Sequence, residues 1–131
     1  MIAKRACWTA VLTLLAWPAA AQDSGKGANA GDGQLLFNNA CRTCHTVEEG
    51  DNRLGPSLHG IVGRKAGALP NYGYSDSMKH ADITWDEKTL DRFIASPDSV
   101  VAGNNMTPFG GVASAEDRAR IIAYLKAPGA Q

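Results

Sequence analysis

The sequence has little of what defines several common protein classes. Basic and acidic residues are equal in number, 13 of each, so the basic excess of a nucleic-acid-binding protein is missing. One apolar run stands out, from Ala6 to Trp17, and its roughly dozen residues are too few for a transmembrane helix, which needs about 20. No segment alternates apolar and polar residues convincingly over the length of a strand. These absences favour a small protein built from helices.

The apolar run belongs to a predicted export signal. Lys4 and Arg5 precede the run, and Ala19 and Ala21 are the small residues expected before a cleavage site. We therefore expect residues 1–21 to be a signal peptide that directs the protein to the periplasm of a Gram-negative bacterium. Its retention as a membrane anchor is the weaker alternative. Cleavage leaves 11 basic and 13 acidic residues, a net charge of −2, and no further apolar run for stable membrane insertion.

The rest of the chain is predicted to be a flexible lead followed by one domain. Residues 22–32 are mostly small and polar, which is typical of a lead, and residues 33–131 have a length that suits a single domain. Within the domain, residues 48–74 contain eight glycines and prolines. So long a loop is unusual in a compact domain unless it wraps around something.

Helical signals surround this loop. A helix is expected from about Gly33 into the first cysteine of the domain, and one or two helical turns are expected after Ser75. Thr84, with Glu87 three residues later, predicts a capping box and a helix that follows it. Ser114 predicts the cap of the last helix. The expected fold class is all-α, with several short helices and long loops.

The segment "CRTCH" places Cys41 and Cys44 three positions apart, with His45 directly after them. A structural zinc site needs four ligands, and His59 and His80 are too isolated to complete one. A thioredoxin-like dithiol follows a strand in a βαβ pattern, which the chain lacks. In an exported chain the motif is typical of covalent haem attachment, because its two thiols match the two vinyl groups of the porphyrin. We predict one haem c, bound through Cys41 and Cys44, with His45 as the proximal iron ligand.

A second axial ligand is predicted at Met106. This residue lies in the loop "VAGNNMTPFGG", far from His45 in the sequence, where a side chain can reach the opposite face of the ring. Met78 lies in a short predicted helix and is better explained by core packing. His59 is expected to brace a loop by a hydrogen bond, and His80 to lie on the surface.

At this point the chain resembles a class I c-type cytochrome, closest to bacterial cytochrome c2 and mitochondrial cytochrome c. The likeness covers nearly all of the chain after the signal peptide. It rests on "CRTCHTV", "LGPSLHGIVGRKAG", "YGYSDSMK", "ITWDEKTLDRFIASP", "GNNM" and "RIIAYLK", which occur in the family's order. The resemblance implies the cytochrome c fold, in which short helices and long loops wrap around one covalently bound haem.

The resemblance also implies residue roles at the haem. Cys41 and Cys44 form the thioethers, and His45 and Met106 are the axial ligands. The Pro56 carbonyl is expected to accept a hydrogen bond from the His45 ring, the usual way in which a ligating histidine is oriented.

Further residues are implied to face the haem propionates. They are Arg64, Tyr74 and Trp85, with Asn104 joining them, since buried carboxylates need such donors. Without the resemblance, Tyr74 and Trp85 read as ordinary core aromatics, and Arg64 as half of a solvated pair with Lys65.

The resemblance has consequences for packing as well. Gly33 and Phe37 are expected to cross Ile121 and Tyr124, where the first and last helices meet. The chain departs from the family at Phe93, where a tyrosine is often found.

The implied function is that of a soluble periplasmic one-electron carrier and not an enzyme, because two filled axial positions leave none for a substrate. Expected partners are redox proteins such as a respiratory or photosynthetic bc1-type complex, an oxidase, a reductase or a dehydrogenase, together with the cytochrome c maturation machinery. We expect a monomer. The family's basic docking surface has few counterparts here, namely Lys26, Lys65, Lys79 and Lys88. The alternatives are a haem subunit of an enzyme, such as a peroxidase or a dehydrogenase, and a haem-based ligand sensor.

Overall fold

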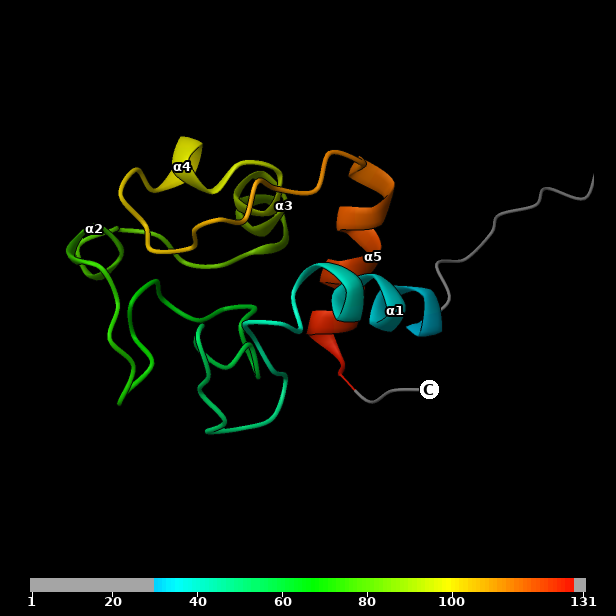
Figure 1. The fold of residues 1–131 in the computed structure, drawn as a ribbon, viewed down its shortest axis with the longest axis horizontal. Coiled ribbons are helices and arrows are strands. Elements are labelled where there is room, and N and C mark those ends of the chain that lie inside the picture. Colours follow the sequence, from blue (N-terminus) through cyan, green and yellow to red (C-terminus); the bar gives the residue numbers. More distant parts are fainter. Residues whose placement is uncertain (1–29, 129–131) are drawn as a thin grey trace, which may run out of the picture.

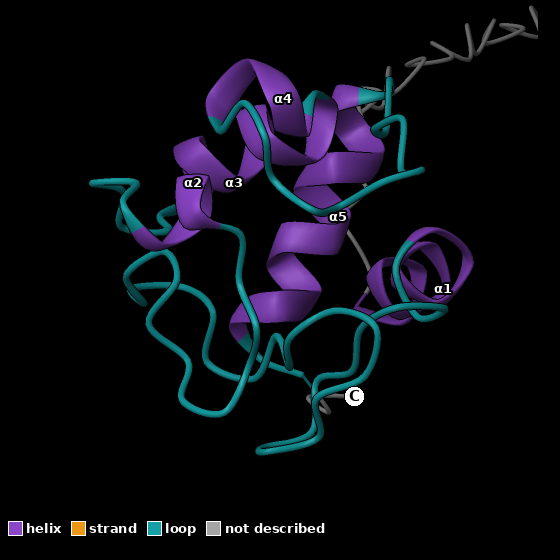
Figure 2. Cartoon of the chain, turned by 60° about the vertical axis from the view of Figure 1, so that its left-hand side comes forward, coloured by secondary structure: helices purple, strands orange, loops and turns teal. Residues whose placement is uncertain are grey.

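The computed structural model describes residues 30–128 of the chain. Helices joined by long loops make up this range (Figures 1 and 2). The helices are α1 (Ala30–Ala40), α2 (Asp76–Lys79), α3 (Glu87–Ala95), α4 (Pro97–Val100) and α5 (Ala115–Lys126). Within residues 30–128 there is no strand, and Lys65 and Thr84 form an isolated antiparallel bridge. The all-α prediction is confirmed.

Helix α1 begins earlier than predicted. It starts at Ala30, whereas the lead was expected to extend over residues 22–32 and the helix to start at Gly33. Asp32 lies in the first turn, where a negative charge interacts favourably with the helix dipole. Tertiary packing against α5 offsets the poor helix propensity of the glycines. The predicted signal peptide, residues 1–21, and most of the predicted lead lie outside the described residues.

Helix α1 lies across α5, as the resemblance implied (Figure 1). Gly33 packs tightly against α5: a Cβ atom there would lie 3.0 Å from Cβ of Tyr124 and closer still to the carbonyl oxygen of Arg120. Beside it, the rings of Phe37 and Tyr124 have their centroids 5.4 Å apart, and Ile121 is only 1% exposed. The missing side chain at position 33 therefore sets the spacing of the two helices.

The start of α3 differs from the prediction. The capping box expected from Thr84 and Glu87 is not formed, and Asp86 is the capping residue; its carboxylate accepts a hydrogen bond from the Thr89 amide at 2.6 Å. The cause is the antiparallel bridge between Thr84 and Lys65, which commits the backbone at Thr84 to an extended pairing. The helix can begin only after this pairing ends.

The other predicted caps are present. The hydroxyl of Ser75 accepts from the Met78 amide at 3.2 Å, and that of Ser114 accepts from the Asp117 amide at 3.2 Å. Helix α4 is a further helix that the sequence did not predict. Proline is well suited to the first turn of a helix, where its missing N–H is not needed, and here it opens α4.

The hydrophobic core joins three helices to the loops. Its residues are Phe37 from α1 and Cys41 directly after it, Leu90, Phe93 and Ile94 from α3, Ile121, Ile122, Tyr124 and Leu125 from α5, and Ile61, Ala66, Trp85 and Val101 from the loops. The loops therefore contribute buried residues to the core and do not only cover its surface. None of the helices in the described part of the chain is long and apolar enough to cross a membrane.

Candidate functional site

The two cysteines and His45 lie on one turn that continues α1. The amide of Cys41 bonds back to the Phe37 carbonyl at 2.8 Å, and the amides of Cys44 and His45 both bond to the Cys41 carbonyl, at 3.1 and 2.9 Å. Positions i, i+3 and i+4 of a helical turn share one face. The two thiols and the imidazole are therefore placed by the same local hydrogen bonds. Neither thiol forms a disulfide.

The imidazole of His45 is buried and has a fixed orientation. Its Nδ1 donates a hydrogen bond to the Pro56 carbonyl at 2.8 Å, which is the contact that the resemblance implied. Gly55 packs against the ring face: a Cβ atom there would lie 2.6 Å from His45 Nδ1. Because Nδ1 is engaged, Nε2 is the nitrogen left to bind a metal.

The electrostatic environment of His45 favours the neutral ring. Burial lowers the pKa of His45; the Pro56 hydrogen bond opposes this effect, and the positive charge of Arg64 adds to it. A neutral imidazole is the form that ligates iron. Burial, with the nearby Cys44, raises the pKa of the Cys41 thiol to about 11, so this thiol carries its proton at neutral pH.

Hydrogen bonds hold the loop after the attachment turn in place. Thr46 Oγ1 donates to the Asp51 carbonyl at 2.9 Å, and the Gly55 amide donates to the Cys44 carbonyl at 2.8 Å. Ser57, which is almost completely buried, donates to the Glu48 carbonyl at 2.5 Å. Sequence reasoning did not identify these bracing residues. The Gly-Pro pair directly before Ser57 was the available signal, since glycine permits the close approach to the ring.

Arg64, Tyr74 and Trp85 come together in the structure. The Trp85 amide donates to the Arg64 carbonyl at 2.9 Å, and Trp85 is buried with its ring 4.9 Å from that of Phe93. Burial raises the pKa of Tyr74, while the neighbouring Arg64 charge and a backbone hydrogen bond from Leu69 lower it in part.

The guanidinium of Arg64 donates to two backbone carbonyls, those of Ser57 at 2.8 Å and His59 at 3.1 Å. Arg64 thus links the tyrosine and tryptophan to the His45 loop.

Asn104 is engaged elsewhere than the resemblance implied. Its Nδ2 donates to Asp98 Oδ1 at 2.7 Å and to the Val101 carbonyl at 2.9 Å, and its Oδ1 accepts from the Met106 amide at 2.8 Å. Both amide hydrogens have protein acceptors, so the geometry differs from the expected propionate contact. Asn104 fixes the backbone at Met106, whose half-buried side chain packs against the hydrophobic core.

The other potential ligands behave as predicted. Met78 packs against the core from α2. His59 Nδ1 donates to the Val47 carbonyl at 3.2 Å, which braces the loop, and His80 is exposed, with Nδ1 bonded to the Asp76 carbonyl at 2.8 Å.

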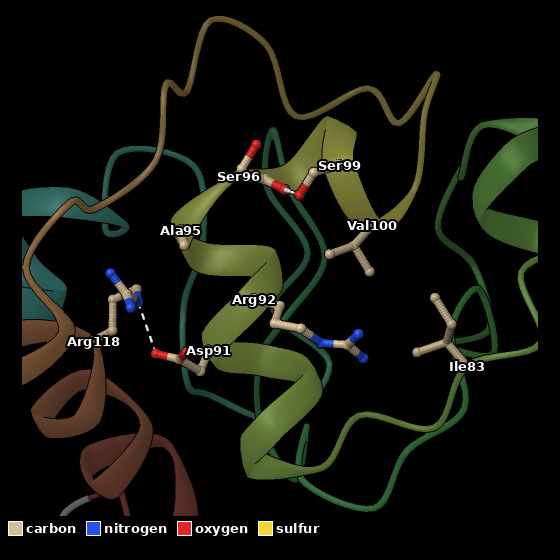
Figure 3. A pocket seen from close by; sticks show the side chains of 8 residues that line it. All are labelled: Ile83, Asp91, Arg92, Ala95, Ser96, Ser99, Val100 and Arg118. Atoms are coloured by element: carbon tan, nitrogen blue, oxygen red, sulfur yellow. Dashed lines mark hydrogen bonds and ion pairs between the residues drawn. The ribbon is translucent and has the colours of Figure 1, made fainter.

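Two hollows bear on the position of the site. A cavity of about 250 Å³ reaches His45 and is also lined by Phe37 and Tyr124. A larger groove of about 540 Å³ runs between α3 and α4, and Figure 3 shows its lining side chains. There Arg118 turns toward Asp91 while Arg92 points away from them, along the groove. None of the predicted haem-binding residues lines this groove, so it is separate from the attachment site.

Two free thiols and an oriented imidazole on one turn define the class of protein as one that binds haem covalently. A family model described as "Cytochrome C oxidase, cbb3-type, subunit III" matches residues 28–125. Cytochrome c of Gibberella zeae is 44% identical over 79% of this chain and 92% of its own. Cytochrome c2 iso-2 of Magnetospirillum fulvum is 48% identical over 66% of this chain and 88% of its own.

A solved structure of a c-type cytochrome is also similar to this chain. Cytochrome cH from Methylobacterium extorquens superposes with a TM-score of 0.69 at 39% identity, and the match covers 74% of this chain and 96% of that chain. The chain belongs to the class I c-type cytochromes. Its cofactor is haem c, attached through Cys41 and Cys44, and it functions as a small electron carrier.

Proposed function

We propose that the protein is a periplasmic one-electron carrier in which His45 and Met106 are the axial ligands of the haem iron. The observation that carries the proposal is the hydrogen bond from Nδ1 of the buried His45 imidazole to the Pro56 carbonyl, which leaves Nε2 as the nitrogen that would bind the iron. When bound, haem c supplies one reversible oxidation and reduction at its iron. The chain holds the ligands and keeps the iron from binding a substrate.

The chain's own residues adapt the site to electron transfer. The apolar core around Trp85 and Phe93 provides a surrounding of low polarity, which disfavours the additional charge of the oxidised state. Arg64, Tyr74 and the buried Trp85 are the groups we assign to the propionates. Arg64 is already held by the Ser57 and His59 carbonyls, so its charge is in position before any carboxylate binds.

The surface near the attachment turn suggests how a partner docks. Six of the ten basic side chains in residues 30–128 form ion pairs with neighbouring carboxylates. Leu54 is 78% exposed, and it precedes Gly55, whose amide is bonded to the Cys44 carbonyl. An exposed leucine beside the haem-bearing cysteine, next to the Arg53–Asp51 ion pair, supports apolar docking. We therefore expect salt to affect docking only weakly.

The partners we propose are exported or membrane-bound redox proteins, namely a bc1-type complex, an oxidase, a reductase or a dehydrogenase. The cytochrome c maturation machinery would attach the haem. We propose that the carrier is a monomer and that its signal peptide is cleaved.

An optical experiment tests the ligand assignment. The ferric protein is expected to show the weak sulfur-to-iron charge-transfer band that methionine ligation produces, and Met106→Ala should abolish it. Met78→Ala is the matched control, because Met78 also packs against the core and should leave the band in place. If Met106→Ala leaves the spectrum unchanged, the carrier assignment with this ligand fails.

A second candidate function follows from the description of the matching family model, which names a subunit of an oxidase. In this case the chain would be a fixed haem subunit of an enzyme and not a diffusing carrier. Purification from the native cell separates the two. A carrier is recovered without oxidase activity, whereas a fixed subunit co-purifies with the oxidase in constant ratio.

A further inference from the structure

A chain of hydrogen bonds connects Met106 to a short helix. The Met106 amide donates to Asn104 Oδ1 at 2.8 Å, and Asn104 Nδ2 donates to Asp98 Oδ1 at 2.7 Å. Asn104 is 6% exposed, and its second amide hydrogen bonds to the Val101 carbonyl at 2.9 Å. Two acceptors face Nδ2 and one donor faces Oδ1, so the orientation of the amide is unambiguous.

The far end of this chain is anchored in the fold. Asp98 lies in α4, which follows α3 directly and packs against it (Figure 2). Pro97, the first residue of α4, and Val101, directly after the helix, are both buried. The Asp98 carboxylate is exposed, but its backbone is held on both sides by the core. It can therefore act as a fixed point for the Met106 loop.

The chemistry of these hydrogen bonds between Asp98, Asn104 and Met106 favours a role beyond loop closure. A hydrogen bond to a carboxylate is charge-assisted and stronger than one between neutral groups. It polarises the Asn104 amide, which makes Oδ1 a better acceptor for the Met106 N–H. Groups that do not touch the metal but orient one of its ligands affect how strongly that ligand binds the metal.

We propose that Asp98 is a positioning residue for Met106 and acts through Asn104. The inference rests on the proposed function, in which Met106 is the sixth ligand. Asp98 holds Asn104, Asn104 holds the Met106 backbone, and the thioether is thereby kept at the iron against competing ligands. The polar atoms of Asn104 that the resemblance assigned to the propionates are used for this purpose.

Competition with imidazole tests the proposal. Added imidazole binds ferric haem only where it displaces Met106, so its apparent affinity for the haem-loaded protein reports how firmly the methionine is held. Asp98→Ala is expected to raise the affinity for imidazole by about three- to tenfold, because the charge-assisted hydrogen bond from Asn104 to Asp98 is lost. Asn104→Ala should raise it at least as much. In the double variant Asp98→Ala should add little, because both residues act through one chain.

Controls separate this role from a structural one. Ser99→Ala changes the neighbouring exposed residue of the same helix, whose hydroxyl bonds locally to the Ser96 carbonyl, and should leave imidazole binding as in the parent. If Asp98→Ala does not load haem, Asp98→Asn, which keeps an acceptor oxygen without the charge, should give a smaller increase. An affinity for Asp98→Ala equal to that of Ser99→Ala overturns the positioning role. A parent protein without the sulfur-to-iron band overturns the proposed function instead, so the two failures are distinguishable.

Discussion

Replacing Gly33 by alanine sets two effects of opposite sign against each other. Alanine is the better helix former by about 1 kcal/mol, so an isolated α1 would gain from the change. In the folded protein, however, the new methyl group meets the carbonyl oxygen of Arg120 and lies 3.0 Å from Cβ of Tyr124. Both of these atoms belong to the body of α5 and cannot turn away as the end of a flexible side chain could.

The steric effect is expected to win. Adding a methylene to a well-packed contact costs about 1–3 kcal/mol, and a clash with backbone belongs at the upper end of this range. After the propensity gain is subtracted, the net loss is about 2 kcal/mol in the free energy of unfolding. For a domain of this size it corresponds to a fall in melting temperature of roughly 8–16 °C.

Thermal unfolding of the haem-loaded protein, followed by far-ultraviolet circular dichroism, measures the effect. Gly73→Ala is the control, because a Cβ atom at Gly73 meets nothing within 4 Å and its φ is not positive. It should change the melting temperature little. A Gly33→Ala protein as stable as the parent, or more stable, would refute the reasoning, since the spacing of α1 and α5 would then not depend on this glycine.

Three further predictions concern a cap, an ion pair and the surface. Hydrogen bonds from Thr89 lower the pKa of Asp86. The stabilising contribution of Asp86 is therefore complete above the unfolded pKa of about 4 and is lost as the pH falls through the lower folded value. In urea unfolding, Asp86→Ala should be less stable than the parent at pH 7, and this difference in the free energy of unfolding should disappear in acid. Arg118 is 12% exposed and bonds to Asp91 at 2.7 Å and to two backbone carbonyls, so Arg118→Met should cost about 2 kcal/mol in urea unfolding. Asp91→Ala should cost less, because that carboxylate is 41% exposed and the carbonyl partners of Arg118 remain; equal losses would contradict this account. Leu54→Ser should slow electron transfer to a membrane oxidase in stopped-flow kinetics without changing the haem spectrum, and an unchanged rate would remove Leu54 from the docking surface.

The chemistry of the attachment turn could be inferred from the sequence because it is local. Cys41, Cys44 and His45 are within one turn, and their spacing alone matches the two vinyl groups and the iron. The caps at Ser75 and Ser114 were correct for the same reason, since each hydroxyl bonds to an amide three residues away.

Contacts between distant segments decided the rest. Thr84 carries a good capping signal, but pairing with Lys65 commits its backbone to another structure, and Asp86 caps the helix instead. Asn104 has the right chemistry for a propionate, yet Asp98 and Val101 lie close enough to take both of its amide hydrogens.

The sequence by itself therefore determined the haem attachment, the helical fold class and the caps at Ser75 and Ser114, all of which depend on residues within a few positions of one another. The tertiary structure decided the helix crossing distance at Gly33, the cradle of Gly55 around His45 and the anchoring of Met106 through Asn104 to Asp98. Each of these depends on which distant atoms come into contact, because packing and hydrogen bonding select among conformations that local preference leaves open.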